Sequence, residues 1–294
     1  MPIPRLIFVT GKGGTGKSTI ASAIATINAE SGRKVLLLDV QERSSLHDIF
    51  GIEFQVGRKI QVGELPLDLL SIDADESFLD YLDKFYNLRI AGSLLKTLGA
   101  MEFATTTAPG LSDILLVGYA ANAARSNAYD LVIVDAVPTG RFEKFITTAD
   151  ALMNMAKTGP IFDQALLVKN EIEAQTTAVI GVTTTDDLAL IEISQMIEYV
   201  RRKNIKLMMS VLNQSVHADF SLDENNLGEL NEKETRALLD TATLLTKKST
   251  RTDRAREELQ QLAPLAVIED FPVVDLKTLS HIGKQIIKVW KNND

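Results

Sequence analysis

A glycine-rich run, GKGGTGKST at residues 11–19, ends in a lysine and two hydroxyl residues. Its spacing fits the pattern G-x-x-x-x-G-K-[ST], in which backbone N–H groups surround phosphate oxygens and the lysine neutralises their charge. An apolar segment at residues 6–9 precedes it. A helix that begins after such a loop adds the positive end of its dipole. We therefore predict a phosphate-binding loop in which Lys17 faces the phosphates. The residues expected to bind them are Gly11, Gly13, Gly14, Thr15, Gly16, Lys17, Ser18 and Thr19.

The same glycines also fit G-x-G-x-x-G, the spacing of a dinucleotide-binding loop. Asp39 ends the second apolar segment about 20 residues later, where dinucleotide folds carry the acid that binds a ribose hydroxyl. A glycine-rich turn without a ligand is a third interpretation. The first forty residues leave these alternatives open.

A second motif, LVIVD at residues 131–135, favours the first interpretation. In nucleoside-triphosphate sites an apolar strand that ends in an acid places a carboxylate near the magnesium ion, here Asp135, while the hydroxyl of Ser18 reaches the same ion. Pro138 and Gly140 follow, and they suit a loop that rearranges when the terminal phosphate leaves. The sequence thus predicts a magnesium site at Ser18 and Asp135.

Seven apolar segments alternate with helical patterns and must position these motifs. They lie at residues 6–9, 35–38, 67–72, 131–134, 178–182, 207–212 and 265–268. Their continuous apolarity is typical of strands that are covered on both faces. Helical periodicity follows at residues 187–200 and again from Leu279 to Val289. We therefore predict an α/β fold, a doubly wound, mostly parallel sheet of seven to eight strands.

The fold is expected to form a single domain over residues 1–294, with helical insertions at residues 75–127 and 152–175 at one end of the sheet. The apolar side chains of residues 90–120 allow two interpretations, a groove for a hydrophobic client and helices that pack on each other. The charged stretch at residues 231–262 predicts a solvated pair of helices.

Composition excludes several classes of function. The chain carries a net charge of −8, has no cysteine and has three histidines. An acidic chain is not expected to bind nucleic acid in general. Without cysteine there are no disulfides, thiolate nucleophiles, iron–sulfur clusters or zinc–thiolate sites. No apolar run is long enough for a transmembrane segment or a signal peptide, so we expect a cytoplasmic protein.

The loop at residues 11–18, with its extra lysine at Lys12, resembles the deviant Walker A loop of ATPases of the ArsA and tail-anchored-protein-targeting type. Residues 135–140, DAVPTG, resemble the switch II motif D-x-x-P-T-G-H of that family, with Arg141 in place of histidine. Residues 109–113, PGLSD, resemble its P-G-[IL]-x-[DE] element. Residues 103–110 are similar to the short anion-transporting ATPases of actinobacteria.

This resemblance implies a dimeric switch that binds and hydrolyses Mg-ATP, as a homodimer or as a heterodimer with a paralogous ATPase. Lys12 would reach the phosphates bound by the partner subunit. Asn213 would bind the adenine edge, and Pro272 and Val273 would pack on the base. A hydrophobic client or a membrane protein is a further partner that the resemblance suggests.

Two departures from the family pattern bear on activity. Gln41 stands where the family has the aspartate that activates water, and Glu42 beside it is the alternative base. Glutamine orients water but cannot accept its proton, so we expect slow hydrolysis, or a catalytically weak subunit that pairs with an active paralogue. The absence of cysteine argues against thiolate-bound arsenite and against a zinc-linked dimer.

Overall fold

The computed structural model describes residues 4–40, 45–53, 56–72, 111–155, 157–217, 231–272 and 274–292. Its strands form one eight-stranded sheet in the order β3-β4-β2-β5-β1-β6-β7-β8, and all neighbours are parallel except β3 and β4. The strands are β1 (Leu6–Gly11), β2 (Val35–Asp39), β3 (Ile60–Gln61), β4 (Leu67–Ser71), β5 (Leu131–Asp135), β6 (Thr177–Thr183), β7 (Leu207–Ser215) and β8 (Leu265–Glu269).

The predicted mostly parallel α/β sheet is confirmed, and each of the seven apolar segments coincides with a strand, the third extending one residue beyond β4. The sequence did not reveal β3, because its two residues are not fully buried and carry no apolar pattern. A strand this short and this exposed leaves no periodic signal to detect.

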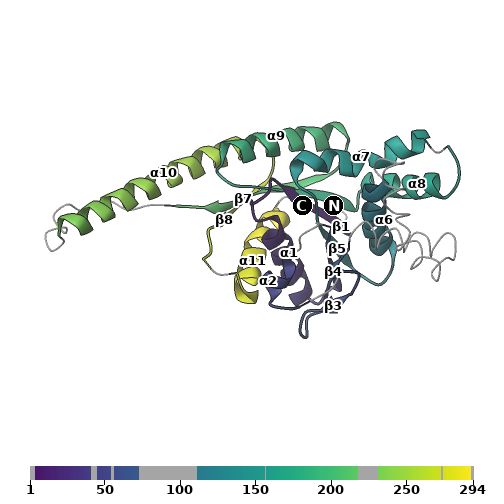
Figure 1. Cartoon of the computed structure of the whole chain (residues 1–294), viewed down its shortest axis with the longest axis horizontal. Coiled ribbons are helices and arrows are strands. Elements are labelled where there is room, and N and C mark those ends of the chain that lie inside the picture. Colours follow the sequence, from purple (N-terminus) through teal and green to yellow (C-terminus); the bar gives the residue numbers. More distant parts are fainter. Residues whose placement is uncertain are drawn as a thin grey trace, which may run out of the picture.

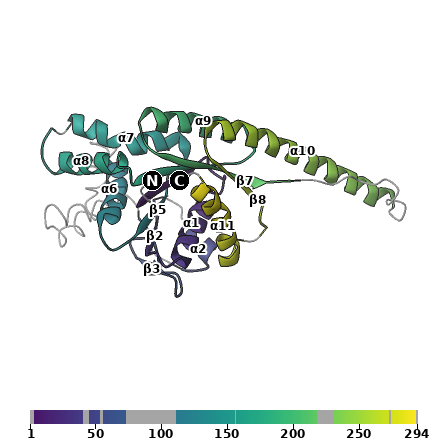
Figure 2. The ribbon, with the colours of Figure 1, turned by 180° about the vertical axis from the view of Figure 1, so that it is seen from behind.

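Helices cover both faces of the sheet, as Figures 1 and 2 show from opposite sides. The helices are α1 (Lys17–Glu30), α2 (Leu46–Phe50), α6 (Leu111–Arg125), α7 (Thr139–Met155), α8 (Pro160–Ile172), α9 (Asp187–Arg202), α10 (Glu232–Leu262) and α11 (Leu276–Asn292). One buried apolar cluster lies between the sheet and α1 and α11, and the other lies between the sheet and α6 to α9.

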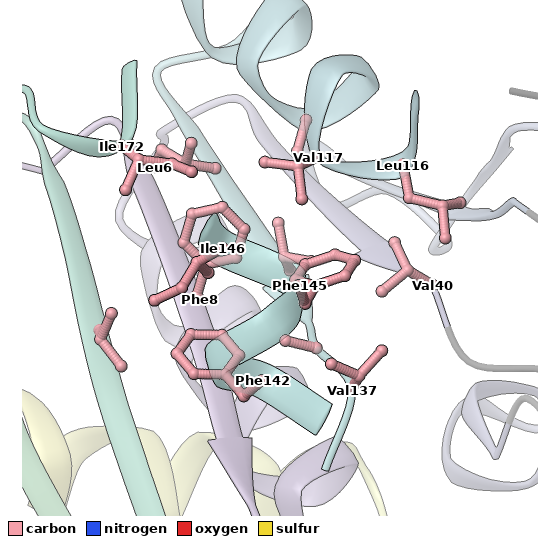
Figure 3. Packing of buried hydrophobic residues seen from close by; sticks show 14 of the residues in the cluster. Leu6, Phe8, Val40, Leu116, Val117, Val137, Phe142, Phe145, Ile146 and Ile172 are labelled. Atoms are coloured by element: carbon pink, nitrogen blue, oxygen red, sulfur yellow. The ribbon is translucent and has the colours of Figure 1, made fainter. Parts of the chain in front are cut away.

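Alternate residues of β1 serve these two clusters, which explains the continuous apolarity of the strand. Ile7 and Val9 belong to the cluster under α1, and Phe8 belongs to the cluster on the other face. There Phe8 meets Phe142 and Phe145 of α7 edge to face, with ring centroids 6.3 Å and 6.5 Å away. Figure 3 shows these rings beside side chains of α6 and α8. The phosphate loop therefore starts from a strand that is fixed on both sides.

Helix α10 corrects one prediction. Residues 232–262 form a single helix of 31 residues, so the expected helix pair is wrong. No glycine or proline interrupts this stretch, and Asn231 and Glu234 close a capping box at its start. Figures 1 and 2 show its amino-terminal half extending beyond the other labelled elements.

The predicted helical insertions are described in part. Residues 73–110 lie outside the described residues, while α6 covers the end of the first insertion and α8 lies within the second. In α6, Ile114, Leu115, Leu116 and Val117 are buried in the cluster that also contains residues of α7 and α8. For this part of residues 90–120, the structure thus favours helices that pack on each other.

Close contact between α1 and α11 gives a test of this packing. A methyl group at Gly283 of α11 would lie 2.6 Å from the carbonyl oxygen of Ala23 and 2.7 Å from Cβ of Ile27. We expect Gly283→Ala to lower the free energy of unfolding by about 1–3 kcal/mol, because α1 must shift away. Urea unfolding followed by circular dichroism measures this change. Gly140→Ala, which adds a methyl group with no neighbour within 4 Å, is the control, and equal stability of both variants would contradict the prediction.

Candidate nucleotide-binding site

The glycine-rich run forms a tight loop between β1 and α1. Gly14 and Gly16 have φ angles of 84° and 85°, a left-handed conformation that favours glycine. A methyl group at Gly11 would lie 2.0 Å from the carbonyl oxygen of Val182, so this position has no room for a side chain. The hydroxyl of Thr15 donates to the carbonyl oxygen of Lys12 at 2.8 Å and closes the turn. Gly13 and Gly14 remain exposed, which leaves the loop open to a ligand.

Lys17 is the first residue of α1. Its side chain is buried and lies beside two carboxylates. Asp135 and Asp39 end neighbouring strands at the same register position, and both are fully buried. Burial lowers the pKa of Lys17, and the charges of Asp135 and then Asp39 partly offset this effect. One cation and two carboxylates at the carboxyl-terminal ends of these strands are groups suited to a magnesium-bound polyphosphate.

The donors fit a magnesium ion. Mg²⁺ commonly takes one or two protein oxygens and completes its shell with phosphate oxygens and water. Ser18 stands in the first turn of α1, next to Lys17, and Asp135 lies at the end of β5 close to the same lysine. The sequence placed these two residues in one site, and the structure brings their elements to the same edge of the sheet.

The strand order excludes the dinucleotide interpretation of the loop. In a dinucleotide fold the first two strands are neighbours, so the acid after the second strand reaches the ribose. Here β5 lies between β1 and β2. Asp39 is therefore placed beside Asp135 and Lys17, at the expected position of the phosphates and the metal.

Asn213 near the end of β7 contacts the loop directly. Its side-chain nitrogen donates to the carbonyl oxygen of Thr15 at 2.9 Å, and the side chain is buried. A methyl group at Gly16 would lie 2.2 Å from that nitrogen. The assignment of Asn213 to the base stays a prediction, and the structure shows instead a contact that fixes the phosphate loop.

Lys12 forms an ion pair within its own chain. Its ammonium group lies 3.4 Å from the carboxylate of Asp186, which also caps α9 by accepting from the backbone N–H of Ala189. That backbone hydrogen bond, with a smaller contribution from Lys12, lowers the pKa of Asp186. Exposed ion pairs contribute about 0–1 kcal/mol, so Lys12 can leave this partner at little cost.

The segment after Asp135 is hydrogen-bonded to β1 and to α9. The hydroxyl of Thr10 in β1 donates to the carbonyl oxygen of Val137 at 2.8 Å. The hydroxyl of Thr139 donates to the carboxylate of Glu192 in α9 at 2.6 Å. Sequence reasoning did not assign these contacts, because nothing in the local pattern links residues so far apart.

Arg141 takes the position of the family's histidine and pairs with Asp113 of α6 at 2.5 Å. The side chain of Asp113 is almost completely buried, while that of Arg141 is half exposed. Both residues belong to motifs that the sequence singled out, and only the structure shows that the two motifs touch. The pair connects the segment after Asp135 to α6 in the helical layer.

Four other predicted site residues have no geometry to report or lie at the margin. Gln41, Glu42 and Val273 fall outside the described residues. Pro272 follows β8 and is exposed, and no contact of its side chain bears on the base. Their assignment stays a prediction.

The sheet order, the glycine loop, the buried lysine and the acid at the end of β5 together define a P-loop nucleotide-binding protein. Residues 4–165 match the family model described as anion-transporting ATPase. The chain belongs to this ArsA-type ATPase family.

Relatives across the family carry ATPase names. The chain is 36% identical to ATPase BagA of Mycobacterium tuberculosis, over 94% of this chain and 88% of that protein. It is 30% identical to putative arsenical pump-driving ATPase 2 of Aquifex aeolicus, over 57% of this chain and 55% of that protein. An ATPase ASNA1 homolog of Babesia bovis is 34% identical, over 50% of this chain and 39% of that protein. Among the helices that the structure describes, none has the length and apolarity to cross a membrane.

Proposed function

We propose that this ATPase is a slow, dimeric switch that binds Mg-ATP and changes conformation when the terminal phosphate leaves. The observation that carries the proposal is the buried Lys17, held between the phosphate loop and the carboxylates of Asp135 and Asp39. A bound magnesium ion supplies charge neutralisation at the phosphates, with Ser18 and Asp135 as the residues that would hold it. Titration calorimetry with Mg-ATP, combined with phosphate release by the same preparation, tests binding and hydrolysis separately.

The contacts of residues 135–141 support the switch. Thr139 bonds to α9, and Arg141 pairs with Asp113 of α6. A loop that rearranges on loss of phosphate would break or remake these bonds and so move two helices. The chain's own residues thereby offer a route from the site to the helical layer.

A heterodimer with an active paralogue remains the alternative form of this function, because residue 41 is glutamine. A hydrophobic client or membrane protein would in either case be the cargo or target. The absence of cysteine argues against arsenite bound by thiolates, although one relative is named for an arsenical pump.

The predicted role of Lys12 at the phosphates of the partner subunit can be tested, because its partner within the chain, Asp186, offers a control. We expect Lys12→Ala to leave ATP affinity within about threefold and to reduce turnover that depends on protein concentration, since Lys12 would act on the neighbour's phosphates. Calorimetry and phosphate release over a dilution series measure the two effects. Asp186→Asn is the matched control, since it frees Lys12 but keeps an oxygen to cap α9. A loss of ATP affinity in Lys12→Ala as large as in Lys17→Ala would contradict the role across subunits.

Asn213 gives a test of base recognition. If its amide binds adenine, Asn213→Ala leaves polar groups of the base unpaired, which costs about 1–3 kcal/mol. We expect the preference for ATP over GTP to fall by about 5- to 100-fold, measured as the ratio of the two dissociation constants. Equal weakening of ATP and GTP would instead mean that Asn213 acts only by holding Thr15 in the loop.

A further inference from the structure

A pocket with a cationic rim lies between α1 and α11, at the carboxyl-terminal end of α1. Its volume is about 620 Å³, within the range of small-molecule sites. Figures 1 and 2 show the two helices side by side on one face of the sheet. The phosphate loop lies at the opposite end of α1, and a helix of 14 residues spans about 20 Å. The pocket is therefore separate from the nucleotide site.

The charge around this pocket is opposite to that of the chain as a whole. Four of its lining residues are cationic, Arg33, Lys284, Lys288 and Lys291, and none of the described residues that line it is acidic. The net charge of the whole chain is −8. Within the part of the chain that the structure describes, none of the three lysines forms an ion pair. These charges are available to an anion.

Arg33 is held in place by neutral acceptors. Its guanidinium donates to the side-chain oxygen of Asn28 at 2.9 Å and to the backbone carbonyl oxygen of Asp130 at 3.0 Å. Burial lowers the pKa of Arg33, and the nearby charge of Asp130 partly offsets this. A fixed arginine beside flexible lysines gives an anion one rigid contact and several adjustable ones.

The lining also has an apolar part. Trp290 is 8% exposed, and Ile27 and Ile287 complete this surface. The contact of Gly283 with Ile27 brings α1 and α11 close together, so the wall of the pocket exists before a ligand arrives. An inorganic anion would use only the cations, and a neutral apolar molecule would use only the apolar wall.

We propose that this pocket binds a small organic anion with an apolar or aromatic body. The anionic group would be a carboxylate, sulfonate or phosphate at the lysines and Arg33, and the body would lie against Trp290. The proposal is independent of ATP hydrolysis, because the pocket shares no residue with the phosphate loop.

Trp290 is the only tryptophan of the chain, and it reports directly on this pocket. The test probe is 1-anilinonaphthalene-8-sulfonate, titrated with saturating Mg-ATP present and followed by energy transfer from tryptophan. Its matched control is N-phenyl-1-naphthylamine, the same body without the sulfonate. We expect saturable transfer to the sulfonate and affinity for the neutral compound that is weaker by about tenfold or more.

Lys284→Gln/Lys288→Gln should reduce the affinity for the sulfonate by about tenfold or more and leave the neutral probe unchanged. Lys247→Gln/Lys248→Gln in α10 removes the same charge from exposed positions elsewhere and should change neither. Equal binding of the two probes, or full affinity of the Lys284→Gln/Lys288→Gln variant, would overturn the proposal. Energy transfer to the sulfonate probe that is seen without nucleotide and lost when saturating Mg-ATP is added would overturn it as well, since the dye would then occupy the nucleotide site.

Discussion

Lys17→Ala is expected to abolish ATP binding, with a dissociation constant raised by about 100-fold or more. The ammonium group is buried at the start of α1, where hydrogen bonds to charged phosphate oxygens contribute about 1.5–3 kcal/mol each. Removing it also leaves the carboxylates of Asp135 and Asp39 to repel the incoming phosphates. Titration calorimetry with Mg-ATP measures the loss.

The control must separate lost binding from lost folding, because removing a cation from beside buried carboxylates costs about 3–5 kcal/mol of stability. Thermal unfolding of Lys17→Ala shows whether the variant is folded at the temperature of the titration. Lys34→Ala removes an exposed lysine at the other end of the sheet, before β2, and should bind ATP normally. Binding by a folded Lys17→Ala within threefold of the parent would refute the assignment of the site.

Gln41→Asp is expected to raise turnover by about 10²- to 10⁴-fold without changing ATP affinity, because a general base acts after binding. The placement of Asp39 and Val40, the two residues before Gln41, supports this expectation. Asp39 is buried beside Lys17, and the backbone N–H of Val40 points to the carbonyl oxygen of Asp135 at 3.5 Å. Val40, the last described residue before this segment, therefore lies beside the carboxyl-terminal end of β5. Phosphate release at saturating Mg-ATP measures the effect.

Glu42→Ala distinguishes the neighbouring acid from Gln41. If Glu42→Ala stops hydrolysis while Gln41→Asp has no effect, Glu42 is the base and the alignment of this segment with the family pattern is off by one residue. If the parent hydrolyses ATP rapidly and both variants equal it, the residue that activates water lies elsewhere in the protein or on a partner subunit.

Local patterns in the sequence predicted the sheet and singled out the glycine loop between β1 and α1. Buried strands such as β1 are apolar on both faces, and the loop glycines meet φ angles and close contacts that other residues cannot. These properties depend on neighbours in the chain or on a motif of fixed spacing. They can therefore be read without a structure.

Contacts between distant segments could not be predicted in this way. Lys12 meets Asp186 and Arg141 meets Asp113 only because the fold brings their elements together. Asn213 holds Thr15 across 198 residues of sequence. The expected break in α10 failed for another reason, since charge alone does not end a helix and no glycine or proline was present.

Because α10 is long, a small tilt at one end would produce a large displacement at the other. Its 31 residues correspond to a rod of about 45 Å. Three of its four buried residues, Thr252, Ala255 and Leu259, lie near its carboxyl-terminal end, where the helix also packs against α9. A tilt of about 10° at Thr252 would carry the far end of the helix, about 30 Å away, through about 5 Å, given the rise of a helix per residue. Lys12 contacts Asp186, which caps α9, and Thr139 contacts Glu192 within α9. One helix, α9, therefore lies between the nucleotide site and the end of α10 at which such a tilt would occur.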